Sequence, residues 1–134
     1  MLKGLKKRAI FLALWIWQLP QNLLGLLLVT ILRPEDCYDL EGVKLCYASR
    51  MRGGISLGKY IIVRSVFRGM NDQTEKHELG HARQSRMLGP LYLIVIGLPS
   101  LLWAAWWNEG RNRSYYSFYT ERWADYLGGV NRDE

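Results

Sequence analysis

The sequence predicts an α+β fold in which a small antiparallel or mixed sheet packs on two polar helices, with two apolar helical segments attached. Three observations support this prediction: a strand-rich middle at residues 33–89 that also holds a helix, a second helix at 113–129, and uncharged apolar runs at 9–32 and 91–107. At 134 residues the length suits a single domain, 1–134.

The two apolar runs are typical of membrane-associated segments, because neither contains a charged residue. Proline and polar residues interrupt the first run at 18–22 and the second at 97–100. Proline lacks a backbone donor and disfavours helix at the residue before it. We therefore expect residues 9–32 to form either one kinked helix or two short helices joined by a turn.

The basic residues are spread along the chain and accompany no nucleic-acid-binding motif. The net charge is +6, and lipid headgroups explain this excess better than nucleic acid does. Lysines and arginines flank both ends of each apolar run. Because cytoplasmic flanks are enriched in positive charge, the pattern favours a membrane-associated protein with its site on the cytoplasmic face. A first run that crossed the bilayer completely would instead place the site outside, where Cys37 and Cys46 could be oxidised.

Residues 37–46, CYDLEGVKLC, are expected to form a β-hairpin with a two-residue turn at Glu41 and Gly42. This register places Cys37 opposite Cys46 in a non-hydrogen-bonded pair, whose Cα atoms lie close together. The two cysteines can form a disulfide in an oxidising compartment, and two buried thiols are the alternative.

A further strand is indicated over Tyr60–Val63, which is apolar and rich in β-branched residues. The segment 73–88 carries helix signals on both sides. Asp72 and Glu75 resemble a capping box at its start, and Gly89–Pro90 supplies a stop after its end.

Both histidines of the chain, His77 and His81, lie on the helix expected at 73–88, with Glu78 between them in the sequence HELGH. Their i, i+4 spacing projects both imidazoles from one helix face, at a separation that one metal ion can bridge. Glu78 can lean over a metal-bound water and act as general base. Gly80 is expected to let the sheet or a second helix approach the metal. The pattern predicts a zinc site.

A catalytic zinc ion usually has three protein ligands, so the third must come from another segment. Glu121 and Asp125 are four residues apart on the helix expected at 113–129 and so share one of its faces. One of them can bind the metal while the other accepts the free N–H of a ligating histidine. A solvated helix face is the alternative reading of this pair.

The same metal site restricts how the second apolar run meets a membrane. If residues 91–107 crossed the bilayer, Glu121 would lie on the opposite side from both histidines. The run is also short for a full span, and GLPS at 97–100 lies at its midpoint. We therefore expect a re-entrant or surface-lying apolar hairpin that returns the chain to the same face.

HELGH with a later ERWAD resembles the gluzincin zinc metallopeptidases, the thermolysin-like group with an H-E-x-x-H helix, here in a small membrane-associated form. The resemblance implies that His77, His81 and Glu121 bind zinc. It also implies Glu78 as the general base and Asp125 as the partner that orients a ligating histidine.

The family also stabilises the oxyanion of the tetrahedral intermediate with a tyrosine or histidine. Since the chain has no third histidine, the resemblance implies a tyrosine, and Tyr115, Tyr116 and Tyr119 are the candidates. It further suggests that a strand near the active helix, KYIIV at 59–63, pairs with an extended peptide substrate at the sheet edge.

The resemblance thus predicts a membrane-associated zinc-dependent metallopeptidase that binds one Zn²⁺ ion and hydrolyses peptide or protein substrates close to the membrane. The expected partners are this substrate and the lipid bilayer, and nucleic acid is not expected. One alternative is a non-catalytic membrane protein that keeps a structural or vestigial zinc site and acts by binding a partner. Zinc-dependent hydrolysis of a non-peptide bond is another.

Overall fold

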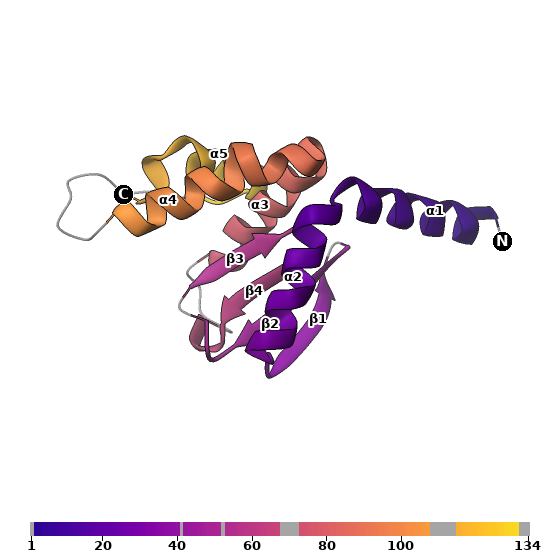
Figure 1. The fold of residues 1–134 in the computed structure, drawn as a ribbon, viewed down its shortest axis with the longest axis horizontal. Coiled ribbons are helices and arrows are strands. Elements are labelled where there is room, and N and C mark those ends of the chain that lie inside the picture. Colours follow the sequence, from indigo (N-terminus) through magenta and orange to yellow (C-terminus); the bar gives the residue numbers. More distant parts are fainter. Residues whose placement is uncertain (1, 41, 52, 68–72, 108–114, 132–134) are drawn as a thin grey trace.

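A computed structural model describes residues 2–40, 42–51, 53–67, 73–107 and 115–131. It confirms the mixed α+β class: helices lie on both faces of one mixed sheet (Figure 1). The main elements are α1 (Leu2–Trp17), α2 (Leu19–Leu32), β1 (Asp36–Leu40), β2 (Val43–Ala48), β3 (Gly54–Leu57), β4 (Tyr60–Arg64), α3 (Thr74–Leu88), α4 (Leu98–Trp106) and α5 (Tyr119–Gly128). Short 3₁₀ turns at Ser65–Phe67, Gly89–Leu91 and Tyr115–Ser117, and a π-helical turn at Leu93–Gly97, complete the list.

The strands follow the order β1-β2-β4-β3 across the sheet. The pairs β1–β2 and β3–β4 are antiparallel, whereas β2 and β4 are parallel neighbours. The segment KYIIV therefore supplies a central strand, and its predicted place at the sheet edge is wrong because β2 and β3 occupy both of its sides. The edge strand nearest the helix α3 is β3.

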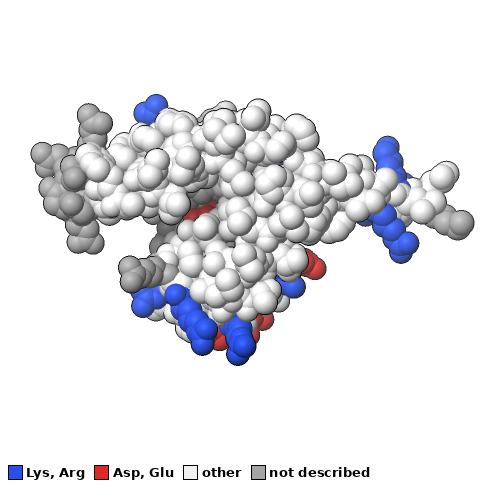
Figure 2. Space-filling model, viewed as in Figure 1, with Lys and Arg blue, Asp and Glu red and all other residues white. Residues whose placement is uncertain are grey.

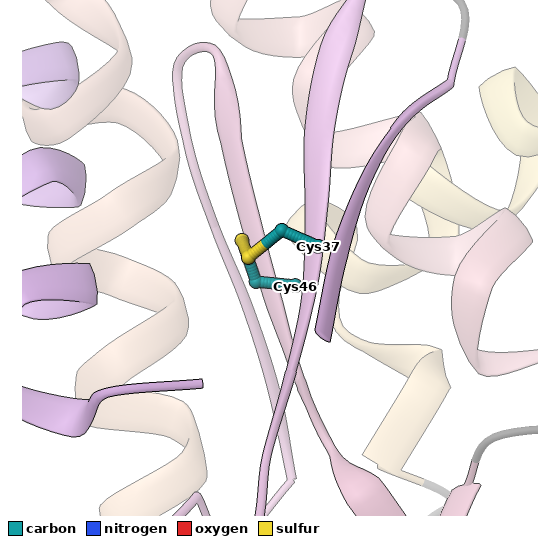
Figure 3. The surroundings of a disulfide bond; sticks show 2 residues. All are labelled: Cys37 and Cys46. Atoms are coloured by element: carbon teal, nitrogen blue, oxygen red, sulfur yellow. A yellow bond between two sulfur atoms is a disulfide. The ribbon is translucent and has the colours of Figure 1, made fainter. Parts of the chain in front are cut away.

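The predicted hairpin register is confirmed, because Cys37 pairs with Cys46 across β1 and β2. The two Cα atoms are 4.1 Å apart, and a disulfide joins the side chains (Figure 3). Gly42 has φ +83°, the left-handed conformation that such a tight turn requires. Glu41 lies outside the described residues. Of the two alternatives for the cysteines, the structure contains the disulfide.

Both faces of the sheet are covered, which explains why β4 is apolar without alternation. One face packs on α3 and the other on α2 (Figure 1). The α3 side is formed by Val43, Leu45, Tyr47, Ile61, Val63, Leu79 and Ala82. The α2 side is formed by Cys46, Ala48 and Ile62, with Leu28, Val29 and Leu32 against them.

The first apolar run forms two short helices, one of the two arrangements expected. α1 and α2 meet at an angle of 88°, with Gln18 between them. Pro20 lies in the first turn of α2, where a backbone N–H has no acceptor within the helix, so proline is tolerated there. Gln21 donates hydrogen bonds to Ser85 and to the Gly89 carbonyl, and so ties this bend to the end of α3.

The second apolar run bends at a different place from the one predicted. α3 ends at Leu88 with Gly89, whose φ is +56°, as its C-cap, and the chain bends by 119° between the helical segments Thr74–Leu91 and Leu93–Trp106. It then continues as one helical path through GLPS, since Gly97 and Leu98 both have right-handed helical dihedrals. The predicted break at 97–100 is wrong, because Pro99 falls in the first turn of α4, directly after the π-helical turn.

The run does not fold into a hairpin by itself, yet the chain does return, because α4 lies beside α5 (Figure 1). In the part of the chain that the structure describes, no single helix is both long and apolar enough to cross a bilayer. The bent pairs α1–α2 and α3–α4 meet that test of length and composition only when the two helices of a pair are counted as one segment.

The two polar helices form close to their predicted bounds. The helix expected at 73–88 is α3, Thr74–Leu88; its N-cap is Gln73, and Asp72 of the proposed capping box lies outside the described residues. The helix expected at 113–129 is shorter, since α5 begins at Tyr119 after a 3₁₀ turn.

Glycines let α3 and α5 pack with their backbones in contact. A Cβ added to Gly80 would lie 1.8 Å from the carbonyl oxygen of Ala124, and one added to Gly128 would lie 1.9 Å from that of Lys76. The expectation that Gly80 admits a second helix is confirmed. This contact sets the distance between the side chains that the two helices present to each other.

We predict that Gly80→Ala destabilises the protein by about 2 kcal/mol or more, because the added methyl meets backbone that cannot move aside. Helix propensity acts in the opposite direction by only about 1 kcal/mol. Urea unfolding followed by circular dichroism measures the change. Gly4→Ala on α1 is the control, because a Cβ there meets nothing within 4 Å. Equal stability of the two variants would contradict the packing described.

Candidate metal centre

Three side chains from two helices converge between α3 and α5. His77 and His81 come from α3, Glu121 comes from α5, and all three are buried. The Oε1 atom of Glu121 lies 3.2 Å from Nε2 of His77 and 3.1 Å from Nε2 of His81. The structure therefore brings together the three residues that the sequence proposed as metal ligands.

Each imidazole has a second partner on its other nitrogen. Nδ1 of His77 lies 2.6 Å from Oδ1 of Asp125, and Nδ1 of His81 lies 2.7 Å from Oε1 of Gln84. When these oxygens accept the Nδ1 protons, both Nε2 atoms present lone pairs. Three acceptor atoms then face one another, and they repel unless a cation lies between them.

The hydrogen bond of Asp125 with His77 agrees with the predicted position of Asp125, whereas Gln84 was missed. Gln84 follows His81 by three residues, so both lie on one face of α3, and this spacing is the signal that could have found it. Its side chain is fully buried and also donates a hydrogen bond of 3.0 Å to the carbonyl of Thr120. Gln84 thus orients the imidazole of His81 and joins α3 to α5 beside Glu121.

The donor set and its spacing fit zinc. Two ligands about 2.0 to 2.1 Å from a tetrahedral zinc ion are about 3.3 Å apart. The carboxylate–imidazole separations of 3.2 and 3.1 Å are close to that value. Two neutral imidazoles and one carboxylate form the ligand set of a common class of catalytic zinc site.

The charges in the site favour a cation at this point. Burial alone would raise the pKa of Glu121, but hydrogen bonds with both histidines and the charge of His81 outweigh it and hold the pKa far below its ordinary value. Burial alone would lower the pKa of His81, but the hydrogen bond with Glu121 and the charges of Glu78 and Glu121 raise it to about 9. In the metal-free protein a proton therefore occupies the place of a metal.

Glu78 lies beside this group but is not one of the three converging residues. It is 6% exposed, and its Oε2 atom has no hydrogen-bond partner. Burial raises its pKa, against the opposing effect of the two histidines. A Cβ added to Gly54 on β3 would lie 2.8 Å from Oε1 of Glu78, so the edge strand passes directly over this carboxylate.

The three candidate tyrosines lie at different places. The ring of Tyr116 meets the ring of His77 edge-on at 5.1 Å. Burial and the charges of Glu121 and Glu78 raise the pKa of Tyr115. Tyr119 is half-exposed and donates its hydroxyl to the carbonyl of Val95, away from the site. Tyr115 and Tyr116 therefore stay candidates, and Tyr119 does not.

The surface is hollowed between the helices and the sheet, and acidic atoms are visible inside this hollow (Figure 2). In this view the surface over α4, beside the hollow, shows almost no charge, whereas Lys and Arg appear in blue on α1 at the right. Comparison of the chain with protein-family models, curated proteins and solved structures gave no match.

We predict that Glu121→Ala abolishes tight zinc binding, whereas Asp125→Ala lowers the affinity by about 10- to 100-fold, because it removes only the partner of a ligand. Competition with a chromophoric chelator measures both constants. Asp39→Ala, an exposed acid on β1, is the control for loss of charge. Unchanged affinity in the Glu121 variant would remove it from the ligand set.

Zinc affinity is expected to rise with pH up to about 9, where His81 loses its proton in the metal-free protein. Zinc binds the deprotonated ring, so each pH unit below that value lowers the apparent association constant by about tenfold. Calorimetry near pH 7 in buffers of different ionisation enthalpy should show about one proton released per zinc ion. Uptake of zinc without proton release would contradict the proposal that His81 carries a proton in the metal-free protein.

Proposed function

We propose that this protein is a zinc-dependent metallopeptidase of the gluzincin type. The convergence of two imidazole nitrogens and one carboxylate oxygen on a single point, with a buried acid beside it, is the observation that supports this proposal most directly. His77, His81 and Glu121 would hold one Zn²⁺ ion, and the hydrogen-bonded Asp125 and Gln84 would fix their orientation.

A zinc ion held there would lower the pKa of a bound water to near 7 and polarise the substrate carbonyl. Glu78 is the group that moves the proton. Its unpartnered Oε2 can accept a proton from the attacking water as the new C–O bond forms. It then delivers that proton to the leaving amine as the C–N bond breaks. A raised pKa suits both tasks, because the carboxyl must take up and release a proton near neutral pH.

The edge strand β3 supports a peptide as the substrate. In the register of β3 with β4, the backbone groups of Gly54 and Ser56 point away from β4. The carbonyl of Ser56 accepts a hydrogen bond from Tyr92, which covers that end of the edge. An extended peptide added beside Gly54 would pass over Glu78. We therefore propose β3, in place of KYIIV, as the strand that would pair with a peptide substrate.

The number of ligands favours a catalytic over a structural site. Structural zinc sites usually have four protein ligands, whereas catalytic sites keep one position for water. Among the described residues, the cluster contains three metal-ligating side chains. A hydrolytic function therefore accounts for the arrangement better than a zinc ion that only stabilises the fold.

Exposed apolar side chains on α1, α2 and α4 support association with a bilayer. They include Leu12, Ile16, Leu23, Leu27, Leu101 and Leu102. A protein held on lipid by these helices would act on membrane-proximal substrates. The cytoplasmic placement of the site stays a prediction from the flanking charges. The disulfide Cys37–Cys46 argues against it, because disulfides persist chiefly in oxidising compartments.

We predict that Glu78→Gln keeps one zinc ion per chain but lowers peptide hydrolysis by about 100- to 10,000-fold, since the amide cannot accept the proton of water. Turnover of a peptide library and metal analysis of the same sample are the two measurements. Glu75→Gln, on the same helix and bonded to Tyr47, is the matched control. Full activity of the Glu78 variant would exclude Glu78 as the general base, whereas zinc-loaded wild-type protein without any turnover would favour a binding function.

A further inference from the structure

The carboxylate of Glu121 is held at its outer oxygen as well as at the oxygen that faces the histidines. Oε2 accepts a hydrogen bond of 2.6 Å from the hydroxyl of Ser100 and another of 2.6 Å from that of Thr120. Oε1 is left to face the two imidazoles. With both lone-pair directions of Oε2 in use, only Oε1 is available to a metal ion.

Ser100 comes from an unexpected part of the chain. It lies on α4, in the sequence LPSLLWAAW, where it is the one residue with a hydroxyl group. Serine within a helix often bonds to the backbone one turn earlier, but here its hydroxyl crosses to a buried carboxylate on α5. Thr120, by contrast, is the immediate neighbour of Glu121 and moves with it.

Trp103 makes a second contact between α4 and the segment that leads into α5. The indole of Trp103 donates a hydrogen bond of 2.7 Å to the carbonyl of Tyr115 and stacks on Phe118 at 4.8 Å between ring centroids. Trp103 follows Ser100 by one helical turn, so both side chains leave α4 toward α5. The outer face of α4 exposes Leu101 and Leu102 instead.

We propose that Ser100 is a positioning residue for the metal ligand Glu121, and that the apolar helix α4 is therefore part of the metal centre rather than only a membrane-facing element. The proposal rests on the metal site proposed above. The hydroxyl holds the carboxylate so that it binds through one oxygen, and it prevents rotation of the side chain toward two-oxygen binding or away from the histidines.

The test is the zinc dissociation constant of the full-length protein in detergent micelles, measured by chelator competition. Ser100→Ala is expected to raise this constant by about 10- to 100-fold, the usual effect of removing a partner of a ligand. Ser100→Thr keeps the hydroxyl and is expected to keep the wild-type constant. Ser65→Ala is the matched control, because Ser65 also donates to a carboxylate, but its acceptor Glu35 is not one of the three converging side chains.

A second readout separates positioning from general stability. In the Co²⁺-substituted protein, Ser100→Ala is expected to change the visible absorption bands, because the carboxylate can then bind through both oxygens. Ser65→Ala should leave these bands unchanged. Should the alanine variant fail to fold, as judged by circular dichroism, Ser100→Cys replaces it in both measurements, because a thiol of similar size is only a weak hydrogen-bond donor.

The outcomes are distinct. Wild-type protein that binds no zinc would overturn the proposed function, and this inference with it. Wild-type protein that binds zinc, with an alanine variant of equal affinity and unchanged Co²⁺ bands, would overturn only the role of Ser100. Equal losses in the alanine and threonine variants would do the same, since the hydroxyl would then not be the cause.

Discussion

The backbone contact between α3 and α5 determines where every group of the candidate metal centre lies. Gly80 and Gly128 each leave room for a carbonyl group of the facing helix, and a Cβ at either place would lie less than 2 Å from it. Glu121 reaches the two histidines only because the helices come this close. A displacement of α5 by the width of one methyl group would leave Oε1 too far from the imidazoles to share one ion with them. The candidate centre thus depends on glycine at positions 80 and 128 as well as on the three converging side chains.

Short-range signals in the sequence predicted much of what surrounds this contact. The register of the β1–β2 hairpin follows from a two-residue turn that sets Cys37 opposite Cys46. The end of α3 follows from Gly89, which adopts a conformation that other residues rarely enter. Helical spacing places His77 and His81 on one face of α3, and it places Glu121 and Asp125 on one face of α5. Each of these features is decided within about ten residues, so a single sequence is sufficient to find it.

The features that the sequence did not predict depend on distant parts of the chain. The central place of β4 results from its insertion between β2 and β3, and no local pattern encodes strand order. The bend predicted at Pro99 lies instead near Gly89. Proline is tolerated in the first turn of a helix, whereas the positive φ of Gly89 ends the regular path of α3. The bond from Gln84 to the carbonyl of Thr120 and the bond from Ser100 to Glu121 become visible only once α5 lies against α3 and α4.

Buried hydrogen bonds attach the first two helices to the end of α3. Gln18 accepts a hydrogen bond from Ser85, Gln21 donates to the same serine, and the indole of Trp17 donates to the carbonyl of Arg86. Gln18, Gln21 and Ser85 are fully buried, and separating them would leave polar groups without partners. Such contacts specify an orientation, whereas apolar contacts permit sliding. The apolar outer faces of α1 and α2 are therefore held at a fixed angle to the helix that carries both histidines. If those faces rest on lipid, as the proposed function requires, the membrane surface and the metal centre have a defined relative position.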